Sequence, residues 1–158
     1  MSQISRKKSR KFLFQKLFAE TFSKFDEADF RDSFLVDSYK WHIDEEYIVE
    51  MEKIIKENED KLIELIKMYA PKFSPEKMIL TYVIPIFIWA SEMLYYKEEI
   101  PAKVSINEAI ELAKTYWDDS ARRIVNWVLN NLLKNYDEIK EKLDNLEKKE
   151  DSFSFFKN

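Results

Sequence analysis

The sequence predicts an all-α protein of about six or seven helices. Apolar side chains recur at spacings of three and four residues along most of the chain, which is the period of a helix with one buried face. Residues that commonly begin or end helices separate these stretches, among them Asp44, Pro71, Pro75 and Pro101. At 158 residues the chain is most simply one domain, long enough to bury a core without disulfides.

Residues 5 to about 25 are predicted to form the first helix. Its basic residues occupy the first turns, where positive charge opposes the helix dipole at a cost of some tenths of a kcal/mol. An anionic ligand would explain that cost. Residues 26–43 show no clean period and are interpreted as a linker with one helical turn at most. The apolar stripe of the first helix consists of Leu13, Phe14, Leu17, Phe18, Phe22 and Phe25.

The middle of the chain predicts one long helical stretch and one buried helix. Asp44 is the expected N-cap of the first stretch, which reaches Ala70, and the polar residues 56–60 are a candidate point of division into two helices. Residues 76–97 are apolar almost all round and predict a central helix that Pro85 kinks or splits.

Residues 100–133 predict a hairpin of two capped helices with a buried seam. Ser105 and Glu108 fit a capping box at the start of the first helix, and Asp119 and Ser120 offer a cap for the second. Residues 134–150 predict an exposed helix with apolar residues along one side. The aromatic segment 152–156 is interpreted as a tail, with a docking peptide as the alternative.

The charges of the chain are unevenly distributed. Residues 1–16 carry six basic and no acidic residues, whereas the whole chain has 26 basic and 30 acidic residues and a net charge of −4. A basic segment on an acidic body favours a localised anion-binding site, and a solvated basic tail is the alternative interpretation.

The residues needed for catalysis are scarce. His42 is the single histidine and cysteine is absent, so neither histidine-activated nucleophiles nor thiolate metal sites are expected. A weak metal site of His42 with Glu45 or Glu46 is a minor alternative to a surface histidine. No glycine-rich phosphate loop is present. We therefore expect a non-enzymatic protein without a cofactor or metal.

The location of the protein is also constrained. No apolar run reaches the roughly 20 residues that span a bilayer, and the basic N-terminus lacks the apolar core of a signal peptide. The absence of cysteine suits a reducing compartment. These observations predict a cytoplasmic protein that does not enter a membrane.

Nucleic-acid binding has more support. The basic segment could contact phosphates in a salt-dependent manner, and Arg122 and Arg123 add positive charge at the start of a later helix. Phe18 and Tyr116 offer ring faces on which unpaired bases could stack, although core packing is the more common role of such residues.

Two stretches of the chain resemble the NusB family of transcription antitermination factors. Ile100, Pro101 and the uninterrupted INEAIELAK of residues 106–114 match the C-terminal signature of that family, and Asn126 lies in its V-N-x-V-L continuation. The segment SRKFLFQKLF resembles the family's opening A-R-E-x-A-L-Q-A-L-Y, with Arg10 and Gln15 in register.

This resemblance implies a NusB-like domain of two packed helical bundles over residues 1–133, with the basic arm at 1–11 and an extension at 134–158. It implies binding of single-stranded boxA RNA together with NusE, the small-subunit ribosomal protein. The complex would hold RNA polymerase in a termination-resistant state, notably on ribosomal RNA operons. The implied RNA-binding residues are Arg6, Lys7, Lys8, Arg10, Gln15, Phe18, Tyr116, Ser120, Arg122, Arg123 and Asn126.

Departures from the family pattern leave alternatives open. Ile124 replaces a usual phenylalanine that could stack on a base, and Ser120 replaces a frequent acid, which should favour RNA binding. One alternative is an accessory RNA-binding module like the NusB-like domain of some RNA methyltransferases. Another is a helical protein-interaction domain that has lost RNA binding. Some relatives form homodimers that hide the RNA surface.

The chain contains no glycine, although average usage of about 7% predicts about eleven. Trp117 and Trp127 stand where the family pattern has glycine, and Trp89 stands where many relatives have glycine or alanine. One hypothesis is that the organism reads UGA codons as glycine; genuine divergence is the alternative. UGG codons at Trp117 and Trp127 would contradict the hypothesis.

Overall fold

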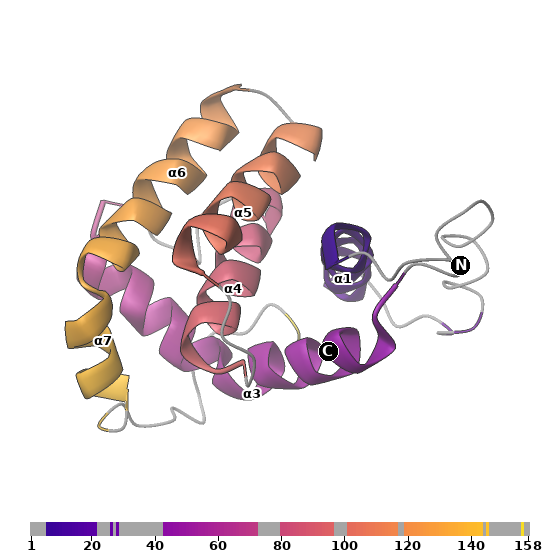
Figure 1. Ribbon diagram of the computed structural model, residues 1–158, viewed down its shortest axis with the longest axis horizontal. Helices are drawn as coiled ribbons and strands as arrows, with labels where there is room; N and C mark the ends of the chain where they lie inside the picture. Colours follow the sequence, from indigo (N-terminus) through magenta and orange to yellow (C-terminus); the bar gives the residue numbers. More distant parts are fainter. Residues whose placement is uncertain are drawn as a thin grey trace.

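The computed structural model describes residues 6–21, 26, 28, 43–72, 80–96, 101–116, 119–143, 145 and 156. This part of the chain contains helices and turns but no strand, which confirms the predicted all-α class (Figure 1). The helices are α1 (Arg6–Glu20), α3 (Glu45–Tyr69), α4 (Leu80–Leu94), α5 (Ala102–Tyr116), α6 (Asp119–Lys134) and α7 (Tyr136–Leu143).

Helix α4 lies at the centre of the fold. It contacts α1 and α3 from the first half of the chain and α5 and α6 from the second half. Residues 83–92 are all buried, as expected for a helix that is apolar on every side. Pro85 lies inside α4 without splitting it. The predicted start of this helix, residues 76–79, falls outside the described residues.

Helix α1 packs its apolar residues against α3 and α4. Leu13, Phe14 and Leu17 are buried as predicted, and Phe18 packs against the core while remaining partly exposed. Phe12, which the predicted stripe did not include, is also fully buried. The expected continuation of the helix through residues 22–25, and nearly all of the linker 26–43, lie outside the described residues.

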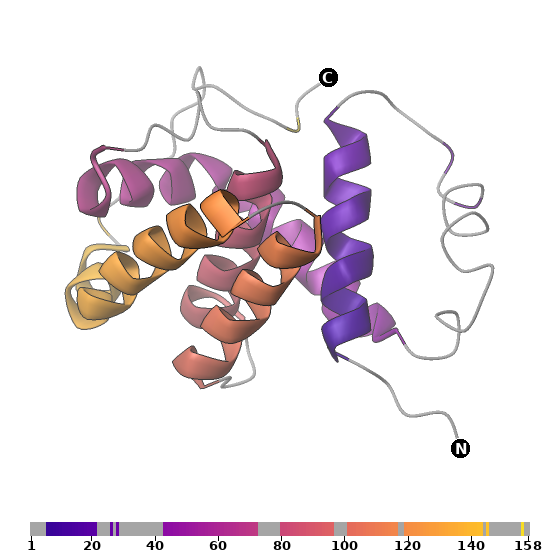
Figure 2. The ribbon, with the colours of Figure 1, turned by 90° about the horizontal axis from the view of Figure 1, so that it is seen from above.

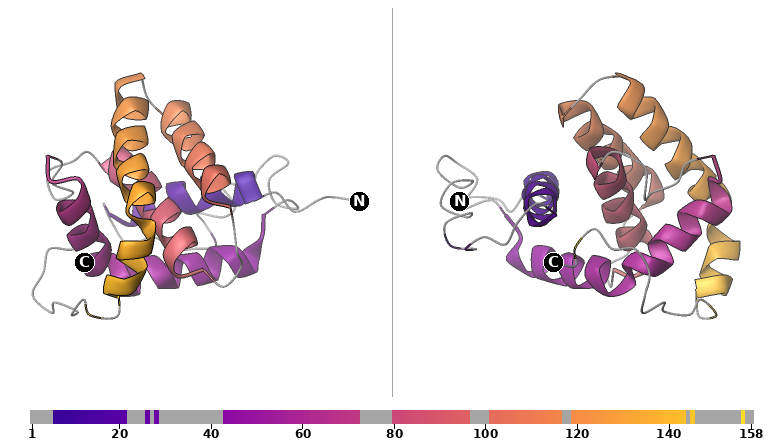
Figure 3. Two further views of the ribbon diagram at one scale, coloured as in Figure 1. Left: turned by 60° about the vertical axis from the view of Figure 1, so that its left-hand side comes forward. Right: turned by 180° about the vertical axis from the view of Figure 1, so that it is seen from behind.

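Helix α3 is a single helix of 25 residues, so the division expected at residues 56–60 is wrong. Lysine and glutamate favour helix, and the Asn58 side chain donates to the main-chain oxygen of Ile54 at 2.9 Å instead of breaking the helix. Asp44 is confirmed as the N-cap, because its carboxylate accepts from the Tyr47 amide at 3.1 Å. The helix runs from α1 at one end of the molecule to α7 at the other (Figures 1 and 3).

The hairpin of α5 and α6 is present, but the predicted capping box is wrong. Helix α5 begins at Ala102, and the amides of Val104 and Ser105 donate to the Pro101 oxygen at 3.0 and 3.2 Å. Ser105 therefore lies within the first turn, and it is buried. Asp119 is the first residue of α6, so its N-cap position falls on residues 117–118, which are not described. The buried seam contains Ile106, Ala109, Leu112, Val125, Val128 and Leu129.

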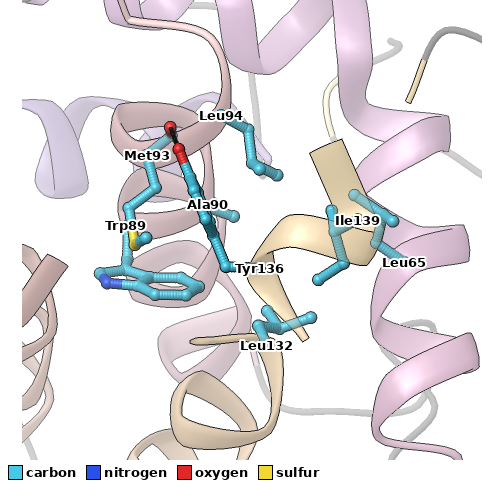
Figure 4. Close-up of a pocket in the computed structure, with 8 residues that line it drawn as sticks. All are labelled: Leu65, Trp89, Ala90, Met93, Leu94, Leu132, Tyr136 and Ile139. Carbon is cyan, nitrogen blue, oxygen red and sulfur yellow. Dashed lines mark hydrogen bonds between the residues drawn. The ribbon is translucent and has the colours of Figure 1, made fainter. Parts of the chain in front are cut away.

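Helix α7 follows a turn at Asn135 and is exposed along one side, with its apolar residues on the other, as the sequence predicted. Its apolar residues Ile139 and Leu143 are buried. Together with Leu132 of α6 and Leu65 of α3, Ile139 lines a small apolar cavity against α4 (Figure 4). The predicted continuation to residue 150 lies outside the described residues.

Side chains of α7 also cover the end of α4. The Tyr136 hydroxyl donates to the main-chain oxygen of Met93 at 3.3 Å (Figure 4). The Lys140 amine donates to the main-chain oxygen of Leu94 at 3.1 Å. The last carbonyl groups of a helix have no partner within the helix, and a cation is favourable there. Phe156 is half-buried and packs against the core, unlike a free tail.

No helix in the described ranges combines the length and apolar character that a membrane span requires.

Candidate nucleic-acid interface

The two faces of α1 carry different kinds of basic residue. At 3.6 residues per turn, Arg6 and Arg10 fall on the same face as the buried Leu13 and Leu17. Lys8, Lys11 and Gln15 fall on the opposite face, and Lys7 and Phe18 border it on one side. Lys7 is exposed, and the other four residues of this outer face are partly exposed. The predicted RNA-binding residues of α1 are therefore divided between an inner and an outer face.

Arg10 is buried in the contact between α1 and α4. Its Nε donates to Oε1 of Glu92 at 2.6 Å, and its Nη2 donates to Oε2 of the same carboxylate at 3.1 Å. The Arg10 Nη1 also lies 3.8 Å from Oε2 of Glu108 in α5. Burial lowers the pKa of Arg10, but the bonds and charge of Glu92 outweigh this and raise it above its ordinary value. Arg10 therefore remains charged inside the fold.

Glu92 accepts two further hydrogen bonds from other helices. The Tyr47 hydroxyl of α3 donates to Oε1, and the Ser105 hydroxyl of α5 donates to Oε2 at 2.9 Å. Burial and the Glu92 charge raise the pKa of Tyr47 well above its ordinary value, so the hydroxyl keeps its proton. Glu92 is 2% exposed, and its carboxylate joins α1, α3, α4 and α5 at one point. We call Arg10, Tyr47, Glu92 and Ser105 the buried polar cluster.

Arg6 is held one turn earlier on the same inner face. Its Nη2 lies 3.4 Å from Oδ2 of Asp44, and its guanidinium carbon lies 4.3 Å from the centre of the Tyr47 ring and 5.4 Å from that of Tyr96. The amide of Asp44 also donates to the Ser9 hydroxyl at 2.7 Å. The N-cap of α3 is thus fixed against the first turns of α1.

Phe18, the aromatic residue proposed to stack on RNA, packs against another aromatic ring of α1. Its ring centre lies 6.1 Å from that of the buried Phe14 at an interplanar angle of 15°, a stacked arrangement. Phe18 is partly buried against the core, and Gln15, one turn earlier, is also partly buried. Both residues still belong to the outer face of α1.

The predicted residues of the hairpin lie at the start of α6. Arg123 and Asn126 are exposed, whereas Arg122 is partly buried and its Nη2 lies 3.8 Å from Oδ1 of Asp119. The Asn126 side-chain oxygen accepts from Nδ2 of Asn130 at 2.6 Å. Tyr116 ends α5 and Ser120 lies in the first turn of α6, but the structure does not describe their side chains.

The structure joins α1 to the hairpin at one defined place. Arg10 contacts Glu108 and, through Glu92, Ser105, so the basic helix is tied to α5 (Figure 2). Arg122 pairs with Asp119 and Asn126 bonds with Asn130, both within α6 itself. A single surface formed by α1 and α6 therefore stays a prediction.

Sequence reasoning missed Tyr47, Glu92 and Ser105 as parts of this site. One signal was available: Glu92 is the one acidic residue in α4, a helix that is otherwise almost entirely apolar. A carboxylate at such a position requires donors from neighbouring helices, because an isolated buried charge is very costly. Its partners could not be named in advance, since Arg10 is 82 residues away along the chain.

The other sequence hypotheses have mixed outcomes. Among the described residues no group of histidine and acidic side chains is arranged to hold a metal, and His42 lies outside them. Trp89 is buried, and its Nε1 has no hydrogen-bond partner in the described part of the chain. Trp127 is 39% exposed on α6, and Trp117 is not described. The hypothesis of UGA reassignment remains untested.

Comparisons with known proteins find relatives that match most of this chain. Residues 7–134 match the NusB family. A transcription antitermination protein NusB of Clostridium acetobutylicum is 30% identical over 135 residues, covering 85% of this chain and 99% of the relative. One from Clostridium perfringens is 33% identical over 141 residues, with 84% and 98% coverage.

A solved structure supports the same assignment. T. maritima NusB superimposes with a TM-score of 0.67 and 27% sequence identity, covering 90% of this chain and 94% of that one. The sequence match extends from α1 to the end of α6, which includes all four residues of the buried polar cluster. The chain therefore belongs to the NusB family.

Proposed function

We propose that this protein is a transcription antitermination factor that binds single-stranded boxA-type RNA together with NusE. Curated relatives that match most of the chain are named transcription antitermination proteins, which supports the general role. The observation that carries RNA binding is the outer face of α1, where Lys7, Lys8 and Lys11 lie beside Gln15 and Phe18. The bound complex would act on RNA polymerase.

The chemistry of these residues suits an unpaired RNA strand. Lysines attract phosphates without reading sequence, whereas an aromatic ring and an amide can stack on and hydrogen-bond with exposed bases. Arg123 and Asn126 on α6 supply a second exposed pair of the same kinds. We propose that NusE completes base selection, because the basic residues alone would bind any strand.

The direct test is titration of boxA-like and scrambled RNA, with and without NusE, at two salt concentrations. We expect preference for boxA-like RNA in the presence of NusE and weaker binding at the higher salt concentration. Equal affinity for both RNAs under every condition would contradict the boxA assignment. Binding of both RNAs without any effect of NusE would favour an accessory module for RNA modification.

Charge reversal locates the contact. Lys7→Glu with Lys8→Glu should weaken RNA binding and reduce the slope of log affinity against log salt by about 1.4, at about 0.7 for each single-strand phosphate contact. A matched control is Lys72→Glu with Lys134→Glu, which changes the net charge equally at two exposed positions, one in the turn after α3 and one at the end of α6. Equal losses of RNA affinity in the two double variants would show that binding depends only on the net charge of the protein.

A second candidate is a protein-interaction domain without RNA binding. Arg6 and Arg10 favour it, because their charges are neutralised by Asp44 and Glu92 inside the fold. Under this reading NusE would bind while neither RNA does. That result would leave the family assignment intact and remove the RNA-binding role.

A further inference from the structure

The inner arginines and the outer lysines of α1 can play different roles in RNA binding. Arg10 is 6% exposed, and its fork is bonded to both oxygens of Glu92. Withdrawing Arg10 toward a phosphate would leave a buried carboxylate without its cation, which is strongly unfavourable. Lys7, Lys8 and Lys11 reach the surface and carry no such constraint from Glu92.

The buried polar cluster fixes the rotation of α1 about its axis. Arg10 is bonded to α4 through Glu92 and lies beside Glu108 of α5, while Tyr47 of α3 donates to the same carboxylate. A bidentate pair sets direction as well as distance. Because Lys7 and Lys11 are three residues before and one after Arg10, their directions follow from the Arg10 bond.

We propose that Arg10 is a positioning residue which, through Glu92, holds the outer face of α1 toward RNA, and that Lys11 belongs to that RNA-contacting face. This inference rests on the proposed function. It assigns the task of phosphate contact to the lysines and the task of orientation to the arginine. Arg10 itself makes no contact with the bound strand.

Glu92→Gln distinguishes positioning from direct contact by the sign of its effect. If Arg10 orients α1, weakening its pair lowers RNA affinity by a factor of about 2 to 30, the range for residues that act through a neighbour. If Arg10 instead contacts phosphate, Glu92→Gln releases its charge and raises affinity. An increase would therefore overturn the proposal.

Arg10→Lys is the second variant, for the case in which Glu92→Gln fails to fold. Lysine keeps the charge but lacks the planar fork that engages both oxygens of Glu92. Positioning predicts reduced RNA affinity, because the orientation of α1 is lost. A direct phosphate contact predicts affinity close to that of the wild type, since lysine also binds phosphate as a point charge.

Lys11→Gln tests the outer face separately. We expect the slope of log affinity against log salt to fall by about 0.7, the value for one single-strand contact. An unchanged slope would remove Lys11 from the RNA-contacting face. A control for general destabilisation is Leu143→Ala, which loses buried apolar contact in α7, outside the buried polar cluster, and should leave RNA affinity unchanged.

Hydrogen exchange provides a readout that needs no RNA. In Glu92→Gln, the amides of residues 10–14 in α1 should exchange faster than in the wild type, while those of residues 62–66 in α3 keep their protection. If exchange became faster to the same extent in both segments, Glu92 would contribute only to global stability. If the wild type binds no RNA but α1 loosens selectively, the proposed function fails while the positioning of α1 stands.

Discussion

At the scale of single residues, Glu92 shows how one buried charge can organise a helical protein. Its carboxylate receives donors from Arg10, Tyr47 and Ser105, so that three helices satisfy a charge carried by a fourth. A buried pair of this kind contributes little net stability compared with apolar packing, but removal of one partner is costly. The cluster therefore selects one arrangement of helices over others.

Tyr47→Phe tests how much the buried polar cluster contributes to stability, with little change in packing. The change removes one hydroxyl donor to a charged acceptor, and we expect the free energy of unfolding to fall by about 2 kcal/mol. Denaturant unfolding of both proteins at neutral pH measures the difference. Loss of less than a few tenths of a kcal/mol would mean that Glu92 does not depend on Tyr47.

The stabilities of the wild type and Tyr47→Phe can also be compared as a function of pH. The pKa of Tyr47 is raised above its ordinary value of 10.0, chiefly by burial. A raised pKa means that the stabilisation is fully present below pH 10 and is lost as pH rises toward the folded-state pKa. The difference between wild type and Tyr47→Phe should therefore narrow above pH 10, and a constant difference would contradict the assignment.

Single residues also show where local patterns suffice and where they fail. Asp44 was identified as an N-cap because a cap involves only its own helix start. Ser105 and Glu108 have the spacing of a capping box, yet the fold uses Ser105 to bond Glu92 and Glu108 to approach Arg10. The same four-residue pattern fits both uses, and only the tertiary neighbours distinguish them.

At the scale of helices, α1 and α3 are joined by a row of alternating charges. Lys16 of α1 lies 2.7 Å from Glu52 of α3, and Lys56 lies 2.7 Å from both Glu52 and Glu20. The Lys16 side chain is 8% exposed, so this row is better shielded from water than a surface ion pair. It explains why Lys16, although basic, is not part of the outer face.

Glu52→Gln should weaken the contact between these two helices. The change removes the charge that pairs with the buried Lys16 amine, and we expect a loss of about 2 kcal/mol at neutral pH, between the values for exposed and buried pairs. Glu57→Gln, at an exposed position of the same helix, is the control and should change stability by less than about 0.5 kcal/mol.

The pH dependence of Glu52→Gln follows from the direction of the pKa shift. Burial raises the pKa of Glu52, but bonds from Lys16 and Lys56 outweigh it and lower the pKa below its ordinary 4.5. The stabilisation is present above pH 4.5 and is lost as pH falls through the folded-state pKa. The wild type and the variant should therefore converge in acid, and a difference that persists there would contradict the prediction.

At the scale of the whole molecule, the fold class and the main helices could be read from the sequence. Periodic apolar stripes determined where α1, α4, α5 and α6 would lie, because each stripe is a local pattern. The undivided α3 could not be predicted, since polar residues on a helix surface look the same as a break. The helical period alone places Arg6 and Arg10 on the buried face of α1, but the bond of Arg10 to Glu92, 82 residues away, could not be predicted.

The described residues beyond the family match also pack against the rest of the fold. The match ends at residue 134, one residue before the turn that leads to α7. Helix α7 buries Ile139 and Leu143 and covers the last carbonyl groups of α4, the helix that carries Glu92. We infer that the C-terminal segment stabilises the same scaffold that positions α1.

Truncation after Asn135 tests this inference. The shortened chain keeps every helix of the family match, so we expect it to fold. It should lose roughly 3 to 6 kcal/mol of unfolding free energy, about 1.5 to 3 for each of the two apolar side chains that α7 buries. Ile139→Ala in the full chain should lose about 3 kcal/mol through the cavity alone.

If thermal and denaturant midpoints of the truncated chain equal those of the wild type, α7 is an appendage. If they fall while RNA affinity at low temperature is unchanged, α7 supports the fold without touching the RNA, as the burial of its apolar face against α3, α4 and α6 requires.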